Sequence, residues 1–340
     1  MTDHPSWLVG GRTTFRVVRH ERSVWVLSCV PISGSGDGVL ARADLISGTG
    51  AGPALDVFDP MSLVGPEPLV ARLRELGLVA RWRNPDLWDA VATAVLRQVI
   101  RAGQARKLYQ GFCRAHGERV ATPFGEAWLF PIPETVLGLS DVEFARLGLA
   151  FKRHALRAAA EACREFGLKW AMLQSVDLVT ELQSVSRVGP WTAGAVVADL
   201  TNDFALYPFA DLAVRTWVDR LAPGRTWPES EHDFALAWAG LAGDHLCAWT
   251  LLTLAWGTDM STGLRSDLIA GADLTRTVDV LFVNAPWRPG GGRRTWLARG
   301  DVPTIARSAA RLSRRMLTSR SAPATRATSS TRCITCARTA

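Results

Sequence analysis

The sequence predicts a mainly α-helical protein with a small β-containing domain at its start and a disordered basic tail at its end. In residues 67–272, apolar side chains recur at three- and four-residue spacing, in short stretches bounded by glycine and proline. Residues 1–66 hold two runs rich in β-branched and aromatic residues, TTFRVV and SVWVLSCV, around a charged turn, which predicts a hairpin. Residues 273–340 end in a stretch rich in Arg, Ala, Ser and Thr, a composition that cannot bury a core.

Two segments of the helical region are the most informative. Residues 84–117 open with Asn84 and Pro85, which we read as a helix cap and first-turn pair, and a break at Gly103 predicts two helices. Residues 175–200 predict a helix, a tight turn and a second helix. In this turn we expect Gly189 to supply a positive φ and Pro190 to begin the second helix.

Charge and composition narrow the class of protein. The net charge is +7, but residues 288–340 contain twelve arginines and one acid, so residues 1–287 carry −4. Basicity is therefore no evidence that the folded part binds nucleic acid. Neither a membrane-spanning run nor a signal peptide is predicted, and six scattered cysteines are typical of a reducing compartment. We expect a cytoplasmic protein.

The turn before Pro190 has a chemical consequence. The first N–H groups of the helix that follows have no partner within that helix, so its N-terminus favours an anion such as a phosphate. An ordinary helical turn explains the same residues equally well.

The surrounding motifs resemble those of the helix–hairpin–helix (HhH-GPD) DNA glycosylase superfamily. The segment LQSVSRVGPWTAGAV is similar to its hairpin, and YPFAD ends in an aspartate, Asp211, 22 positions after Gly189. The superfamily's first helices resemble the upstream segment LWDAVATAVLRQVIRAGQARKLYQGFCRAHG. Its next section resembles FPIPETVLGLSDVEFARLGLAFKRHALRAAAEA, in which Leu147, Gly148 and Lys152 match the positions of its motif. The resemblance covers roughly residues 67–260 and implies an all-α glycosylase domain.

The resemblance also points to one branch of the superfamily. Members that also cut the strand carry a lysine where this chain has Trp191, so the resemblance implies a monofunctional enzyme. After Asp211 the chain has only Cys247, Cys333 and Cys336, too few for the iron–sulfur cluster of other members. Both absences favour the branch of the bacterial 3-methyladenine DNA glycosylase II.

The resemblance implies a role for several residues. Asp211 is the catalytic carboxylate, which stabilises a cationic sugar and orients the attacking water, although it also suits a helix N-cap. Trp191 and Trp256 form the pocket for the base. Gln98 and Val99 fill the gap left by an extruded base, although Val99 equally suits a buried helix position. The DNA-binding hairpin comprises Arg187, Val188, Gly189, Pro190 and Thr192, and a monovalent cation is held by the carbonyls of Gln183, Val185 and Val188.

The chain departs from the pattern at Arg187, where the superfamily usually has glycine. If this position needs a positive φ, arginine costs about 1 kcal/mol there. We therefore expect a monomeric bacterial DNA N-glycosylase, associated with the nucleoid through DNA, that releases alkylated purines such as 3-methyladenine from damaged duplex DNA in base excision repair. The alternatives are a glycosylase for bulky or toxin-derived adducts and a non-catalytic DNA-binding protein.

Overall fold

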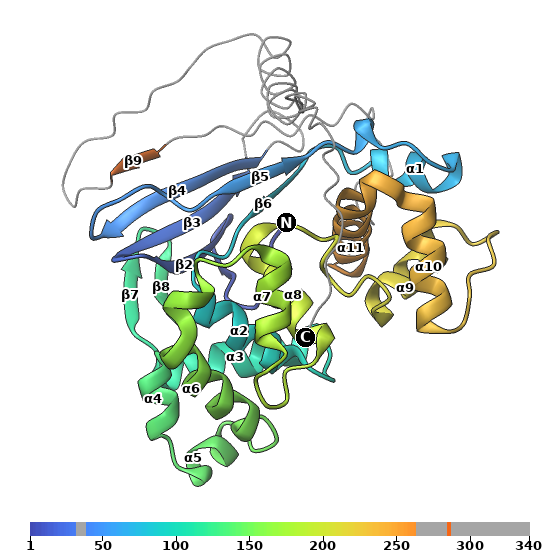
Figure 1. Cartoon of the computed structure of the whole chain (residues 1–340). Helices are drawn as coiled ribbons and strands as arrows, with labels where there is room; N and C mark the ends of the chain where they lie inside the picture. The colour runs from blue at the N-terminus through green and yellow to red at the C-terminus, as the bar shows by residue number, and fades with distance from the viewer. Residues whose placement is uncertain (32–38, 263–283, 287–340) are drawn as a thin grey trace, which may run out of the picture. The chain divides into compact units, whose positions relative to one another are not determined.

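The computed structural model describes residues 1–31, 39–262 and 284–286, all of which belong to one compact unit, Met1–Gly291 (Figure 1). Apart from residues 284–286, the tail predicted to be disordered, residues 273–340, lies outside the described residues. Cys333 and Cys336 lie outside them as well.

The predicted N-terminal hairpin is confirmed as part of a larger sheet. Among the described residues this sheet has the strand order β1-β2-β3-β4-β9. Adjacent strands from β1 to β4 are antiparallel to each other, and β9 runs parallel to β4. The two residues after His20 turn the chain, and the first of them, Glu21, has φ 55°. The strands are β1 (Leu8–Gly10), β2 (Thr13–His20), β3 (Ser23–Pro31), β4 (Val39–Ser47) and β9 (Asn284–Pro286).

The region predicted to be all-α also contains strands. β6 (Val79–Trp82) pairs with β5 (Leu55–Phe58) across the expected domain boundary at residue 66. A second hairpin pairs β7 (Arg119–Thr122) with β8 (Gly125–Trp128). Val120 and Ala127 pack with Val17 on one face of the sheet, so burying that face against the helical region requires these strands. The all-α description of residues 67–272 was therefore too simple.

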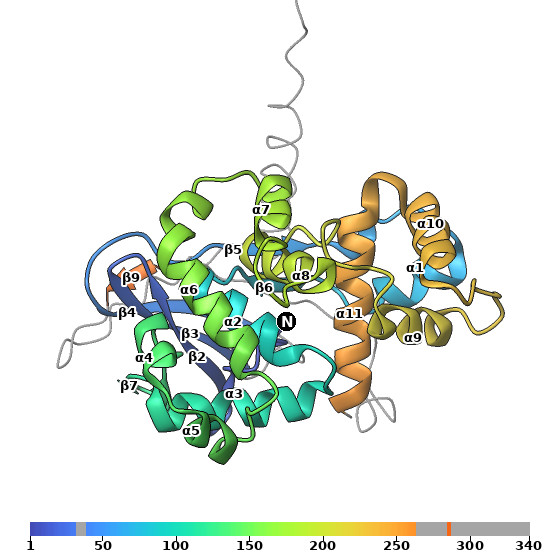
Figure 2. The same cartoon turned by 60° about the horizontal axis from the view of Figure 1, so that its bottom comes forward.

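The helices form one large apolar core. Their bounds are α1 (Glu67–Arg74), α2 (Leu87–Arg97), α3 (Ala102–His116), α4 (Pro133–Gly138), α5 (Asp141–Arg146), α6 (Arg153–Trp170), α7 (Ser175–Leu182), α8 (Pro190–Thr201), α9 (Leu212–Leu221), α10 (Glu231–Ala242) and α11 (Leu246–Thr262); single 3-10 turns cover Pro60–Ser62 and Gly243–His245. Figure 2 shows α2, α4 and α6 over the sheet, while α1, α9, α10 and α11 lie beside it, to the right.

The predicted pair of helices over residues 84–117 exists, but two details were wrong. Asp86, not Asn84, caps α2, because its side chain accepts the Asp89 N–H at 3.1 Å. The break falls immediately after Arg97, while Gly103 lies in the first turn of α3. The chain turns between α2 and α3 without using a glycine.

Asn84 has a different role, which is to join the two helices that carry the candidate site. Its buried amide donates to Asp89 on α2 at 3.0 Å and to Asp199 on α8 at 2.8 Å. Asp199 also accepts from Arg81 at 2.7 Å. Burial raises the pKa of Asp89 to about 6. This polar cluster fixes α8 against α2, so elements at the far ends of these helices keep a constant separation.

Candidate nucleic-acid interface and active site

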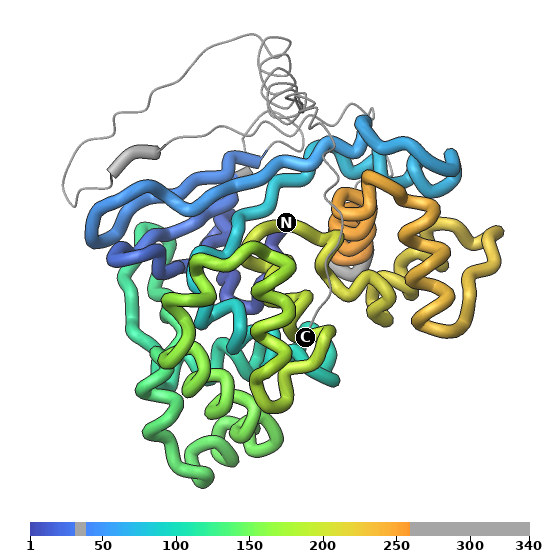
Figure 3. The backbone as a smooth tube through the Cα atoms, in the orientation of Figure 1, coloured from blue at the N-terminus to red at the C-terminus, as the bar shows by residue number. Residues whose placement is uncertain are grey.

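The hairpin joins α7 to α8 through residues 183–189, and Figure 3 follows its backbone. Its left-handed residue is Arg187, at φ 67°. The prediction that Gly189 adopts a positive φ was wrong, since Gly189 is extended at φ −93° and ψ −177°. Pro190 does begin α8, as predicted. The condition for strain at this position is met, since Arg187 has a positive φ, and a residue with a Cβ costs about 1–2 kcal/mol in this conformation.

The outer surface of the hairpin suits an anion. Arg187, Gly189 and Pro190 are exposed, and a Cβ built on Gly189 would meet nothing within 4 Å. The packing of the protein therefore does not require a glycine there, whereas close approach of a ligand would. Val188 and Thr192, also expected in the interface, are only 4% and 3% exposed, so their side chains face inward.

Gln98 and Val99 lie directly after α2 and reach the hairpin. The Gln98 side-chain amide donates to the Arg187 carbonyl at 3.0 Å and to Thr192 Oγ1 at 2.9 Å. Val99 adopts φ 59° and is fully exposed, at 102%. The alternative that Val99 occupies a buried helix position was therefore wrong. An exposed β-branched residue in the left-handed region is rare and marks a functional candidate.

Asp211 stands at the N-terminus of α9, but its carboxylate does not cap that helix. Instead, Oδ2 of Asp211 accepts a hydrogen bond from the Tyr207 hydroxyl at 3.1 Å. Burial and the charge of Asp211 raise the pKa of Tyr207, so the phenol stays protonated and keeps donating. The N-cap alternative holds for the backbone position of Asp211, while its half-buried carboxylate remains available for other contacts.

Gly194 connects this carboxylate to the hairpin. A Cβ at Gly194 would lie 2.5 Å from the Leu206 carbonyl oxygen and 3.1 Å from Pro208 Cδ, so only glycine lets this loop rest on α8. Pro208 in turn accepts the Asp211 N–H at 2.8 Å. Gly194 lies four residues from Pro190, about 6 Å along the helix. The helix α8 therefore begins at the hairpin and, one turn on, supports the loop that leads to Asp211.

The two tryptophans expected in a base pocket differ in their surroundings. Trp191 is half-buried at the start of α8 and, at i and i+3, shares a helix face with Gly194, the residue that seats the loop leading to Asp211. Trp256 is 5% exposed and packs edge-to-face on Trp217 at 6.4 Å between ring centroids. Trp191 therefore packs against the core and keeps part of its surface exposed, whereas Trp256 is buried in the core.

The hairpin carbonyls are uncharged oxygen donors, which fit a monovalent cation better than a transition metal. In the described part of the chain, the Val185 carbonyl accepts the Val188 N–H at 3.0 Å and retains one lone pair. Together with the carbonyls of Gln183 and Val188 it is the donor set expected from the sequence. No group of three or more His, Cys, Asp or Glu side chains suited to a metal occurs among the described residues.

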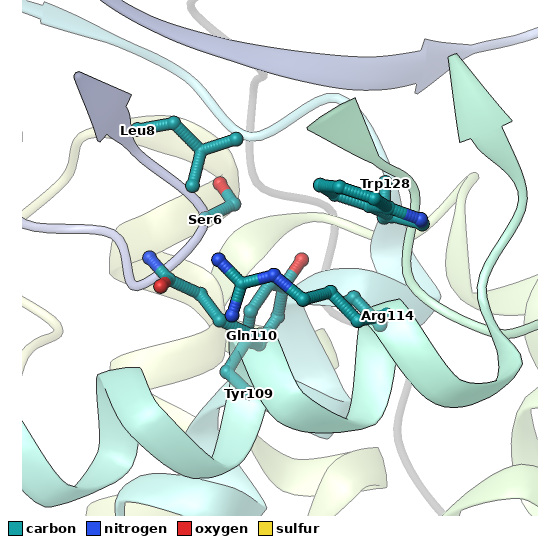
Figure 4. Close-up of a pocket in the computed structure, with 7 residues that line it drawn as sticks. Ser6, Leu8, Tyr109, Gln110, Arg114 and Trp128 are labelled. Atoms are coloured by element: carbon teal, nitrogen blue, oxygen red, sulfur yellow. The ribbon is translucent and has the colours of Figure 1, made fainter. Parts of the chain in front are cut away.

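A separate shallow pocket lies between the N-terminal segment, α3 and β8 (Figure 4). The Arg114 guanidinium lies over the Trp128 ring there, 5.5 Å from its centroid. The pocket shares no residue with the hairpin or with the Asp211 loop. Its lining residues are Ser6, Leu8, Tyr109, Gln110, Cys113, Arg114 and Trp128.

Sequence reasoning missed three residues of the candidate site. Tyr207 and Gly194 hold the Asp211 loop, and Lys152 donates to the Gln98 carbonyl at 2.6 Å. The bare sequence signals only Gly194, as a glycine inside a helix that otherwise has no reason to contain one.

The α7–α8 hairpin, the aspartate that follows it and the turn beside the hairpin are the features on which the resemblance to the helix–hairpin–helix DNA glycosylases rests. Comparison with known proteins confirms the resemblance. The chain is 26% identical over 137 residues to the DNA-3-methyladenine glycosylase of Bacillus subtilis (strain 168), a match covering 38% of this chain and 44% of that protein. The chain thus matches less than half the length of this curated relative. No protein-family model matches it.

Solved structures share the fold at low identity. The 3-methyladenine DNA glycosylase of Archaeoglobus fulgidus has a TM-score of 0.55 at 18% identity, covering 76% of this chain and 91% of that one. The apo 8-oxoguanine glycosylase/lyase of Clostridium acetobutylicum also has a TM-score of 0.55, at 13% identity, covering 75% and 89%. No helix among the described residues is long and apolar enough to cross a membrane.

Proposed function

We propose that this chain is a monofunctional DNA N-glycosylase that removes alkylated purines from duplex DNA. The observation that carries the proposal is the half-buried carboxylate of Asp211, which accepts a hydrogen bond from Tyr207 and does not cap α9. The loop before it rests at Gly194 on α8, the helix whose N-terminus suits a phosphate. Base removal requires a grip on the DNA backbone and an acid near the sugar, and here the N-terminus of α8 offers the first and Asp211, at the start of α9, the second.

The chemistry follows from the charges. Breaking the bond between C1′ and the base leaves a sugar with oxocarbenium character. The Asp211 carboxylate stabilises this cation and accepts a proton from the water that attacks C1′. One acid suffices when the base is already cationic, because alkylation activates the leaving group. The Trp191 ring, at the start of α8, stacks on such a base.

DNA recognition rests on geometry, because residues 1–287 carry a net negative charge. The first N–H groups of α8 and the exposed Arg187 bind a phosphate of the backbone. The carbonyls of Gln183, Val185 and Val188 would hold a monovalent cation, which would supply a further positive charge for the DNA backbone. Val99 projects from the neighbouring turn and fills the space that the extruded base leaves. Position 191 holds a tryptophan and not a lysine, which supports base release without strand cleavage.

The experiment compares free bases released from methylated duplex DNA by the wild type, Asp211→Asn and Asp219→Asn. Asp219 is the matched control, an exposed acid on the same helix. We expect wild-type release of 3-methyladenine, a loss of about 10²-fold or more in Asp211→Asn with DNA affinity retained, and no change in Asp219→Asn. If the wild type releases bases only from DNA that carries bulky adducts, its substrate is that class of lesion and not alkylated purines. Binding without release from either substrate overturns the proposal in favour of a non-catalytic DNA-binding protein.

A further inference from the structure

The turn that carries Val99 holds its backbone in a conformation that valine disfavours. Gln98 has φ −53° and ψ 127°, and Val99 follows with φ 59°, which are close to the first three of the four angles of a type II turn. The second central position of such a turn favours glycine or asparagine, because a Cβ there is crowded. Val99 is fully exposed and buries none of its surface, so packing of its own side chain does not hold the turn in this shape. The restraint must come from its neighbours.

The Gln98 carbonyl is the group through which this restraint acts. It belongs to the peptide plane between Gln98 and Val99, and the φ of Val99 is the rotation that relates this plane to the Val99 side chain. Lys152, the residue immediately before α6, donates from Nζ to this carbonyl oxygen at 2.6 Å. Because α6 packs against α2, the ammonium has a fixed place from which to hold the plane.

The Gln98 side chain holds the other side of the turn. Its amide donates to the Arg187 carbonyl and to Thr192 Oγ1, so the turn is connected to the hairpin that carries the second left-handed residue. If Val99 relaxed to a helical φ, the Gln98 carbonyl would rotate away from Lys152. The half-buried ammonium would then lose the one hydrogen bond that it makes with the described residues, which is unfavourable for a charged donor.

We propose that Lys152 is a positioning residue for base extrusion, because its hydrogen bond to the Gln98 carbonyl holds Val99 in the strained turn from which the side chain enters the DNA. The inference rests on the proposed function, because base release requires that the target base first be extruded from the duplex. It assigns to Lys152 the preorganisation of the wedge and not a contact with the reacting atoms.

The test is a comparison of Lys152→Met with wild type at saturating DNA. Methionine keeps the length of the side chain and removes the ammonium. A 2-aminopurine beside the target site reports extrusion by its fluorescence, and a duplex with an abasic site reports binding when no base has to be moved. We expect the extrusion signal of Lys152→Met to fall at least fivefold, with affinity for the abasic duplex within twofold of wild type. Lys107→Met, which removes an exposed lysine of α3, should change neither quantity.

Two further variants separate positioning from a structural role. Lys152→Arg keeps a donor and should restore most of the extrusion signal. Placing the lesion opposite a mismatch should recover base release by Lys152→Met, because an unpaired base needs no wedge. Loss of thermal stability with an unchanged extrusion signal per folded molecule would overturn the inference, as would equal losses on paired and mismatched DNA.

Failure of the proposed function is recognised separately. Extrusion and abasic-site binding are measured without any base release. A wild type that extrudes in a Lys152-dependent manner but releases no base contradicts the glycosylase proposal and supports this inference.

Discussion

Arg187 offers a direct measurement of the strain in the hairpin, through the pair of variants Arg187→Ala and Arg187→Gly. Both remove the exposed guanidinium, and both leave the backbone carbonyl that accepts from Gln98. They differ only in the Cβ, which is the atom that makes φ 67° unfavourable. The difference in unfolding free energy between the two variants therefore isolates the strain.

The magnitude follows from two opposing terms. A residue with a Cβ costs about 1–2 kcal/mol in the left-handed region. Glycine costs about 0.4–1 kcal/mol relative to alanine, because its unfolded chain is more flexible. We expect Arg187→Gly to be more stable than Arg187→Ala by about 0.5–1 kcal/mol. At Arg164, an exposed position inside α6, the same pair should show the opposite sign by about 1 kcal/mol.

Urea unfolding of the four variants gives these differences, since the midpoint shifts while the slope stays constant. A hairpin in which Arg187→Ala is the more stable variant, as at Arg164, would refute the left-handed assignment. Both Arg187 variants should also reduce the slope of log affinity against log salt for duplex DNA by about 0.9, the effect of one lost phosphate contact. An unchanged slope would show that Arg187 does not contact phosphate.

Three other predictions probe the elements around the site. Gly194→Ala should destabilise the fold by about 1–3 kcal/mol and slow base release, because its Cβ would lie 2.5 Å from a backbone oxygen. The control Gly240→Ala has open space at its Cβ and should stabilise the fold in the same urea series. Gly189→Ala should keep its stability within about 0.5 kcal/mol and weaken DNA binding about tenfold in fluorescence anisotropy; unchanged affinity would contradict close approach of a phosphate. Burial alone would raise the pKa of Asp3, but the charge and hydrogen bonds of Arg81 lower this pKa from 3.8 to about 2. The stability that the ionised Asp3 contributes is therefore lost as the pH falls from 3.8 through about 2. Asp3→Asn should reduce the fall in unfolding free energy with acid, measured between about pH 6 and pH 2.

Much of the fold was readable because periodicity and turn chemistry act locally. The hairpin of β2 and β3, the α7–turn–α8 unit and the start of α8 at Pro190 all follow from patterns within a few residues. The strands β6, β7 and β8 were missed, because each is four residues long and is stabilised by partners elsewhere in the chain rather than by its own pattern.

The candidate site divides in the same way. The sequence predicted strain at Arg187 on the condition of a positive φ, which the structure shows, and it placed Asp211 at the start of a helix, as observed. The roles of Gln98 and Val99 stay predictions. The positive φ was misplaced at Gly189, since only the three-dimensional path of the turn decides which residue adopts it. The contacts of Tyr207 with Asp211, four residues apart, and of Lys152 with Gln98 arise from loop geometry and helix packing, which no local pattern encodes.

The central claim is that Asp211, at the start of α9, is the carboxylate that performs base release. Its most direct test is single-turnover release of 3-methyladenine from methylated duplex by Asp211→Asn, with Asp219→Asn as the control and the affinity of each for DNA measured in parallel. The account predicts that the rate of Asp211→Asn falls by about 10²-fold or more at unchanged affinity. Release by Asp211→Asn at the wild-type rate would contradict it.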